Sequence, residues 1–299
     1  MRKRRTILLI AVLLIGLLAS LTARPRREPS FQGAPLHRWI QSYGDPHLAL
    51  RAELERSQLA IAGIGTNAIP FLLGWMREDP PWLQRMGTVA DNLPFGWRIN
   101  GLLARREARA EDAAFAFSIF GESASNAVPG LSTMLTDPGR RQAALRASQA
   151  LGFIGKPAVP ALIAVLADDR LTNRDLAAGV LSEIHNLGTN ALPAVPFLLE
   201  ALNSPDLELR NNAARALGRI ALEPQKVIPA LMAALADADS NLQRSAVWSL
   251  GHFREQAKPA IPAILELRGK APPDVREGIH NALVLIDPAS IPADDTQQP

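Results

Sequence analysis

The stretch Arg140–Asp169, RRQAALRASQALGFIGKPAVPALIAVLADD, contains two segments in which apolar residues recur at helical spacing. Gly152 and Gly155 stand between the two segments, and Pro157 and Pro160 open the second one. Gly and Pro at these places indicate a turn between helices. The stretch therefore predicts a helical hairpin.

The same hairpin recurs along most of the chain. A Pro opens the second helix of each copy, which is tolerated because N–H groups in the first turn of a helix have no intrahelical partner. These prolines are Pro70, Pro129, Pro160, Pro196, Pro229 and Pro262, with successive steps of 59, 31, 36, 33 and 33 residues. Each first helix closes on an apolar–Gly pair such as Leu217-Gly218 or Leu250-Gly251. We expect this Gly to end the helix and to let two helices cross closely. Helix pairs at this period predict an all-α fold, an α-solenoid of about six hairpins.

Composition and charge narrow the function classes. The chain has no Cys, which excludes disulfides, thiolate metal sites and Cys nucleophiles. Of its 32 Lys and Arg residues, seven lie in residues 1–27, which contain no acid. The remainder has 32 − 7 = 25 basic against 29 acidic residues, a net charge of −4. The basic character therefore belongs to the N-terminal segment, and no nucleic-acid partner is expected.

Residues 1–27, MRKRRTILLIAVLLIGLLASLTARPRR, carry basic residues on both sides of an apolar run from residue 7 to residue 23. A run of this length fits either an uncleaved signal anchor or a cleaved signal peptide. The slight excess of positive charge before the run favours repeats outside the cytoplasm, in the periplasm. The protein would be secreted if the segment is cleaved.

The remaining boundaries follow from periodicity. Residues 28–47 form a linker and an N-terminal capping helix, in which Leu36, Trp39, Ile40 and Tyr43 share one face. The solenoid spans 48–286 and closes with a capping helix near Asp274–Ile286, because repeat arrays need capped ends. Residues 287–299 are expected to be a disordered tail.

The 59-residue step contains an irregular insertion, residues 78–109, expected to form one or two helices with a turn at Pro94–Gly96. Aromatic and Arg residues outside the regular stack could form a partner site, since these residue types are typical of binding hot spots. They are Trp82, Phe95, Trp97 and Arg98. The alternative is that they fill the gap between the first repeat and the rest.

The plan Arg…Ala-Ala…Ala-Leu-Gly…Ile…Val-Pro-Ala-Leu…Asp, most complete over residues 210–237, resembles HEAT repeats of the bacterial phycobilisome-lyase HEAT-like type. The entry Glu-Pro-x-Phe-x-Gly-x-Pro-Leu-x-x-Trp at 28–39, behind a basic anchor, is similar to that of bacterial membrane-anchored HEAT proteins. The resemblance also implies a ladder between an Arg early in each first helix and an Asp in an inter-repeat turn. The matching arginines are Arg174, Arg210, Arg244 and Arg276, with Asp168, Asp237 and Asp274 as partners.

The resemblance further implies that the second helices line a concave face. Their outward positions form a surface of mostly small, uncharged residues, namely Ala161, Ala164, Phe197, Glu200, Ala230, Ala233, Ala263 and Glu266. Such a surface could seat an apolar helix or an extended peptide of a partner. It could equally be tight helix packing without a ligand.

Motifs for chemistry are missing from the sequence. It has no phosphate-binding Gly-rich loop, no nucleophile elbow and no zinc-binding His-Glu-x-x-His. The five His residues occupy different places in their repeats, so no metal column is expected. We predict a membrane-anchored scaffold for a protein partner, without catalysis, cofactor, metal or small-molecule ligand. The alternative is a regulatory subunit or a lyase-like enzyme that uses the 78–109 insertion.

Overall fold

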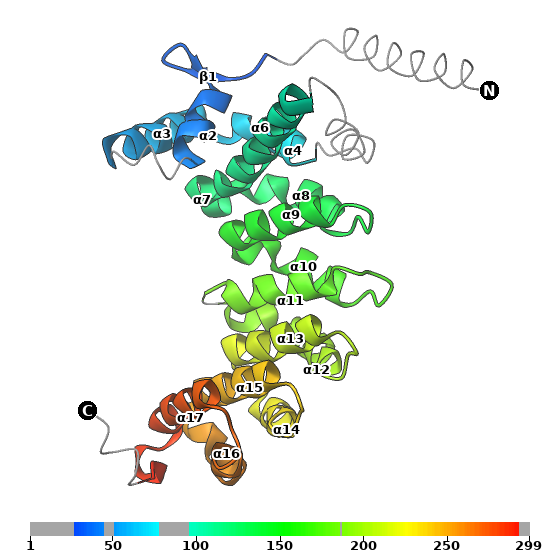
Figure 1. The fold of residues 1–299 in the computed structure, drawn as a ribbon, viewed down its shortest axis with the longest axis vertical. Helices are drawn as coiled ribbons and strands as arrows, with labels where there is room; N and C mark the ends of the chain where they lie inside the picture. Colours follow the sequence, from blue (N-terminus) through cyan, green and yellow to red (C-terminus); the bar gives the residue numbers. More distant parts are fainter. Residues whose placement is uncertain (1–26, 45–50, 78–95, 186, 293–299) are drawn as a thin grey trace, which may run out of the picture.

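The computed structural model describes residues 27–44, 51–77, 96–185 and 187–292. These residues form an all-α solenoid, in which helical pairs follow one another along the long axis of the molecule (Figure 1). The one sheet within the described residues is a two-residue antiparallel ladder between β1 (Ser30–Phe31) and β2 (Ala34–Pro35). The predicted fold class is confirmed.

The pairs form two layers that share one continuous apolar core. The first-helix layer comprises α3 (Arg51–Ile64), α6 (Gly96–Phe115) with its short continuation α7 (Phe117–Phe120), α9 (Arg141–Ile154), α11 (Arg174–Glu183), α13 (Leu207–Ile220), α15 (Ser240–His252) and α17 (Pro273–Ile286). The second-helix layer comprises α4 (Ile69–Arg77), α8 (Val128–Leu135), α10 (Val159–Leu166), α12 (Val195–Ala201), α14 (Pro224–Ala234) and α16 (Ile261–Arg268). Five 3₁₀ segments join the two layers, η1 (Gly65–Ala68), η2 (Gly121–Ala127), η3 (Lys156–Ala158), η4 (Gly188–Ala194) and η5 (Arg254–Ala260).

The landmark prolines open the second helices as predicted, with one exception. In α8, α10, α12 and α16 the Pro stands at the first or second helical position. In α14 the helix begins one turn earlier, at Pro224, so that Pro229 lies inside it. Pro224 offers the same fixed φ that suits a helix start, and this displaces the boundary.

The prediction that the glycines of the apolar–Gly patterns end the first helices and allow close crossing is confirmed in part. Gly121 follows the last residue of α7, with a φ of 51°, but other glycines of these patterns do not end their helices. Gly152, Gly218 and Gly251 all lie inside helices. A Cβ on Gly218 would come within 2.5 Å of the Ser249 Cα, and one on Gly251 within 3.3 Å of the Ala282 Cα. Helix α9 ends instead at Gly155, whose φ of 76° favours glycine.

The two layers differ in how closely their helices are spaced. Successive first helices such as α11, α13 and α15 form extensive contacts, whereas successive second helices touch at few points. A concave surface lined by the second helices stays a prediction.

The entry motif forms the N-terminal cap. Helix α2 (Leu36–Gly44) packs on α3 and α6 with Leu36 and Ile40 fully buried, which confirms the predicted capping helix. The carboxylate of Glu28 accepts the backbone N–H of His37 and lies 2.9 Å from its ring Nδ1. The indole of Trp39 donates to the Ala34 carbonyl oxygen at 3.2 Å, which ties the hairpin to the helix.

The C-terminal end is closed by α17, also as predicted. Val284 stands 33 residues after Gly251, in the column of close-packing glycines, and is 43% exposed. Its side chain occupies the place where another first helix would approach. Part of the predicted disordered tail is structured, because Asp287 caps a 3₁₀ turn, η6 (Pro288–Ser290), and Ile291 packs on the core. Residues 293–299 lie outside the described residues.

One helical run among the described residues, Glu53–Arg77, is long and apolar enough to cross a membrane by length and composition alone. It bends at Gly65, where φ is 65°, and Ile61, Leu72 and Met76 within it are fully buried. We assign it to the first helical pair of the solenoid. The apolar run 7–23 lies outside the described residues.

The Gly218 contact can be tested by substitution. Gly218→Ala places a methyl group against the backbone of α15, and we expect the free energy of unfolding to fall by about 1–3 kcal/mol, as in overpacked cores. Urea denaturation followed by circular dichroism measures this change. Gly74→Ala is the matched control: nothing lies within 4 Å of its added methyl group, so the free energy should rise by up to about 1 kcal/mol. Equal effects at both sites would contradict the packing role of Gly218.

Candidate interaction surfaces

The predicted insertion contains the N-terminal part of a regular first helix. Helix α6 begins at Gly96 and runs unbroken past the predicted boundary at residue 109 to Phe115. It packs against α2, α4 and α9, and the Arg109 guanidinium lies over the Trp75 ring at 5.7 Å. The described half of the insertion thus joins the first repeat to the second.

The structure describes only part of the predicted aromatic site. Trp82 and Phe95 lie outside the described residues. Trp97 and Arg98 fall in the first turn of α6, and the placement of their side chains is outside the described part of the molecule. A partner site at these four residues stays a prediction.

The outward positions of the second helices are only partly exposed. Ala164, Glu200, Ala233 and Glu266 are exposed, whereas Ala161, Phe197, Ala230 and Ala263 are half-buried. Lys270 donates to the Glu266 carboxylate at 2.9 Å, and this hydrogen bond lowers the pKa of Glu266. The surface offers small side chains on helices of 7 to 11 residues.

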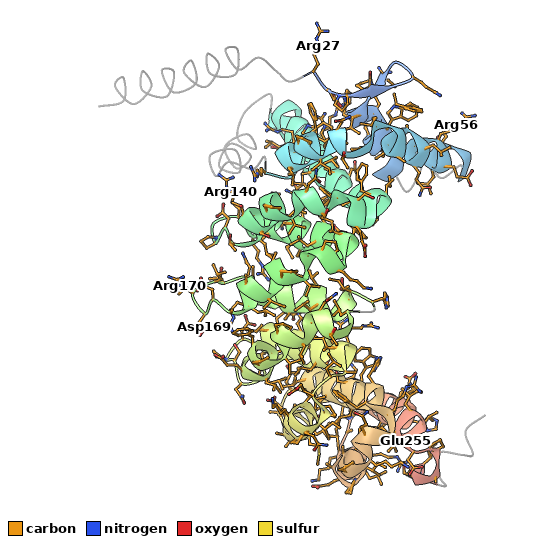
Figure 2. The ribbon with its side chains drawn as sticks, turned by 180° about the vertical axis from the view of Figure 1, so that it is seen from behind. Arg27, Arg56, Arg140, Asp169, Arg170 and Glu255 are labelled. Carbon is orange, nitrogen blue, oxygen red and sulfur yellow. The ribbon has the colours of Figure 1, made fainter. Side chains whose placement is uncertain are left out.

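The arginine ladder forms only in part. Arg210 lies 3.7 Å from Asp237 of the following turn, which joins one arginine and one acid that the resemblance implies. Arg174 pairs with Asp169 rather than with Asp168, because Arg170 already holds Asp168 through its Nε and Nη2 at 2.8 Å. Figure 2 places Asp169 and Arg170 at the edge of the array where the inter-repeat turns gather.

In the other repeats the side chain in this column holds the turn that leads into its own helix. Arg210 Nη1 donates to the Ser204 carbonyl oxygen, and Arg276 Nε to that of Ala271, both at 2.9 Å. Gln243, one residue before Arg244, makes the same bond to Asp237 O at 2.8 Å. The column thus fixes turn carbonyls that would otherwise be unpaired. The side chain of Asp274 is outside the described part of the molecule.

A second polar contact, not predicted, links three first helices. Asp175 of α11 is 3% exposed and receives both terminal nitrogens of Arg141 from α9. The side chain of Asn212, from α13, donates to the Asp175 carbonyl oxygen at 3.1 Å. A buried carboxylate is costly unless it is paired, so this contact fixes the register of the three helices.

The outward face of the same layer carries an arginine–tryptophan cluster, composed of His185, Arg219, Trp248 and His252. Arg219 Nε donates to the Ser182 carbonyl oxygen at 3.0 Å, and its Nη1 lies 3.5 Å from His185 Nδ1. Its guanidinium lies over the Trp248 ring at 5.4 Å, and that ring lies against the His252 ring, with centroids 3.8 Å apart and planes tilted by 42°. The cluster spans three successive repeats and is half-buried, apart from the exposed His185.

Sequence reasoning missed this cluster, although a signal was present. Arg219 and His252 each follow a close-packing glycine, 33 residues apart. Residues at the same place in successive repeats become neighbours on the stacked face, so Arg219 and the α15 residues Trp248 and His252 had to meet. The predicted partner site was placed instead on aromatic residues of the 78–109 insertion, outside the regular repeats.

Among the residues that the structure describes, no group of three or more His, Asp or Glu side chains is placed to hold a metal ion. One open cleft, of about 510 Å³, lies between α3 and α7. Its walls are formed by Glu55, Gln58, Leu59, Ala62 and Ile119.

Comparison with known proteins identifies the repeats. Residues 195–283 are similar to the family model described as HEAT repeats, and the observed helical pairs agree with that similarity. No curated protein matches the chain.

Several solved structures are similar at low identity. An engineered protein is 19% identical, with 84% of this chain and 98% of that chain covered and a TM-score of 0.46. A computationally designed armadillo repeat protein for modular peptide recognition is 18% identical, with coverage of 73% and 100% and a TM-score of 0.45. Another engineered protein is 22% identical, with coverage of 60% and 91% and a TM-score of 0.44.

The Asp168–Arg170 pair predicts a measurable titration. The hydrogen bonds from the Arg170 side chain, and then from its backbone N–H, lower the pKa of Asp168 from 3.8 to about 2. Because the folded-state pKa is lowered, the pair stabilises the turn above about pH 4, and this contribution is lost as the pH falls toward 2. Carboxyl ¹³C shifts should show Asp168 titrating near pH 2, and Arg170→Ala should return the pKa toward 3.8. Lys226→Ala, in the first turn of helix α14, should leave it unchanged. A pKa of Asp168 that is insensitive to Arg170→Ala would contradict the assignment.

Proposed function

We propose that this helical-repeat protein is a non-enzymatic scaffold that binds a protein partner through the outward face of its first helices. Solenoids of this kind present extended surfaces and commonly serve as interaction scaffolds. The partner contacts side chains from several successive repeats at once. The repeats thereby act as one surface.

The arginine–tryptophan cluster is the observation that carries this proposal. Trp and Arg dominate the binding energy of protein interfaces, especially where their conformations are fixed before binding. Arg219 is held from one side by Ser182 O and from the other by the Trp248 ring. A partner that contacts Arg219 and Trp248 therefore loses little binding free energy to the ordering of these side chains.

The proposal assigns no catalytic role to the insertion. Its described part, helix α6, is used in packing against α2, α4 and α9, which favours the interpretation that it fills the gap between repeats. The second-helix surface from Ala161 to Glu266 is proposed as a secondary contact area, because its small side chains let a partner backbone approach closely.

We further propose that residues 7–23 anchor the chain in a membrane and place the repeats outside the cytoplasm. The support is the sequence pattern, an apolar run between basic clusters with the larger positive charge before it. If the segment is removed after export, the same repeats act as a secreted scaffold.

The scaffold function is tested by crosslinking the full chain in the membranes of the cells that produce it and identifying partners by mass spectrometry. Trp248→Ala should reduce capture of the partner strongly, since loss of a hot-spot Trp costs about 2 kcal/mol or more, roughly a 30-fold loss of affinity. Trp248→Phe keeps a ring for Arg219 and should retain most of the capture.

Arg170→Gln serves as the control: Arg170 is exposed in the turn that precedes α11 (Figure 2), whereas the cluster contacts Ser182 and His185 at the other end of that helix. It should leave capture unchanged, and thermal melts should show that all three variants are folded. Absence of any specific crosslinked protein, or equal capture by the Trp248→Ala variant, would overturn the proposal.

The anchor is tested on the natural protein by the mass of its mature form. An intact mass that includes residues 1–27, with the protein extracted from membranes only by detergent, is expected for an anchor. Protease added outside intact cytoplasmic membranes should then degrade the repeats. Protection of the repeats under these conditions would contradict the proposed orientation.

A further inference from the structure

The arginine–tryptophan cluster contains a cation that no acidic side chain of the described chain neutralises. Arg141 and Arg210 each pair with a carboxylate of the following repeat. Arg219 forms no ion pair with an Asp or Glu among the residues that the structure describes. Its contacts are a backbone carbonyl oxygen, an imidazole ring and an indole ring. The guanidinium is therefore held in place by groups that carry no negative charge.

The Arg219 side chain has hydrogen-bond donors left for a ligand. A guanidinium carries five N–H donors in a planar arrangement. Nε donates to the Ser182 carbonyl oxygen at 3.0 Å, and Nη1 lies 3.5 Å from His185 Nδ1. Nη2 donates to no acceptor in the part of the chain that the structure describes, and it reaches the surface. Its two N–H groups can therefore bind an acceptor that a partner supplies.

The rings around Arg219 fix this donor group and add to it. The Trp248 ring covers one face of the guanidinium, and the Nδ1–H of His252 donates to the Trp248 carbonyl oxygen at 2.9 Å. An arginine N–H can only donate, so His185 Nδ1 accepts, and the neutral ring carries its proton on Nε2. Because His185 is exposed, its Nε2–H is a further donor beside Arg219.

A second arginine lies on the same face of α13. Arg215 stands one helical turn before Arg219 and is half-buried. It forms no ion pair within the described ranges of the chain. The positive charge of Arg219 is thus reinforced along its own helix.

The acidic side chains nearest to the cluster along the chain do not offset this charge. Glu223, four residues after Arg219, is paired with Lys226. Glu183 ends α11 and Glu255 lies in the first turn of η5, and both are exposed. Neither carboxylate forms an ion pair with Arg219, and exposed charges that are not in contact interact weakly in water.

From these contacts we infer that the arginine–tryptophan cluster is a carboxylate-binding site, which takes a Glu or Asp side chain of the protein partner. The carboxylate accepts hydrogen bonds from Arg219 Nη2, and the Nε2–H of His185 provides a further donor. Arg215 attracts the same group at longer range. Charge-assisted hydrogen bonds to an arginine are stronger than those between neutral groups. The inference rests on the proposed scaffold function and adds the chemical group that the partner presents.

The test uses the full chain and two labelled synthetic peptides, one of leucine and glutamate and one in which glutamine replaces every glutamate. Binding is measured by fluorescence anisotropy. We expect the glutamate peptide to bind about tenfold more tightly than the glutamine peptide, which corresponds to about 1.4 kcal/mol. The difference should shrink at high salt, because charges at the surface are screened.

Substitutions locate the preference for glutamate on the cluster. Arg219→Gln removes the charge and keeps an amide that can donate to the Ser182 carbonyl oxygen, so it should bring the affinities of the two peptides together. Arg219→Lys should retain only part of the preference, because an ammonium group lacks the planar set of donors. Arg56→Gln is the matched control, since it removes the same charge from an exposed position on α3, in the first repeat (Figure 2). Binding of the glutamate peptide to the basic residues 1–27 would survive all three substitutions.

Equal binding of the two peptides, absence of binding by both, or a preference that Arg219→Gln leaves unchanged would overturn the inference. So would tighter binding of a phosphoserine peptide that is lost in the Arg219→Gln variant, because the site would then take phosphate. Thermal melts check that the variants are folded, and Arg219→Lys carries the test if Arg219→Gln does not fold.

Crosslinking separates this inference from the scaffold function. A partner captured in equal yield from the wild type and the Arg219→Gln variant, but lost in Trp248→Ala, leaves the scaffold function intact and removes only the carboxylate site. Failure to capture any partner removes the scaffold function itself.

Discussion

The rest of the structure depends on the close approach of consecutive first helices. At Gly218 the backbone of α13 lies so near α15 that a methyl group would meet the Ser249 Cα at 2.5 Å. Alanine and serine line the same contacts, and Ser249 itself donates to the Ala214 carbonyl oxygen at 2.8 Å. A contact made by backbone and very short side chains cannot slide or repack without losing many van der Waals partners. The side chains on the outward face of this layer are consequently held at fixed spacing from one repeat to the next.

Polar contacts set the register that apolar packing alone leaves open. Alanine-rich helices offer little that distinguishes one axial position from the next, whereas the carboxylate of Asp175 is satisfied only with Arg141 opposite it. The turn acids do a related task at the helix starts: the carboxylates of Asp206 and Asp239 accept backbone N–H groups in the first turns of α13 and α15. Specificity therefore comes from a few polar side chains, and cohesion from many small apolar ones.

The fold could be predicted from the sequence because the same pattern of Pro and apolar residues recurs in each hairpin. Pro160 and its equivalents predicted the second helices, and periodicity predicted both capping helices. Prediction from the sequence failed where one residue type serves two structural purposes: Gly218 permits the close crossing that was predicted but does not end its helix, and Pro224 rather than Pro229 starts α14. The arginine–tryptophan cluster is a property of stacking, since its members come from different repeats. Predicting it requires knowing which faces of successive hairpins adjoin, and hydrophobic spacing within a single hairpin does not contain that information.

The unequal spacing of the two layers has a mechanical consequence. From α11 to α17 the successive first helices contact one another extensively, whereas successive second helices share few contacts. Bending that moves the second helices apart or together thus breaks few contacts. Separation of the first helices would break many, so this layer changes its length little. The array can therefore bend about the first-helix layer. A ligand bound to the first helices would contact a rigid surface, and one bound between the second helices would change the curvature of the array.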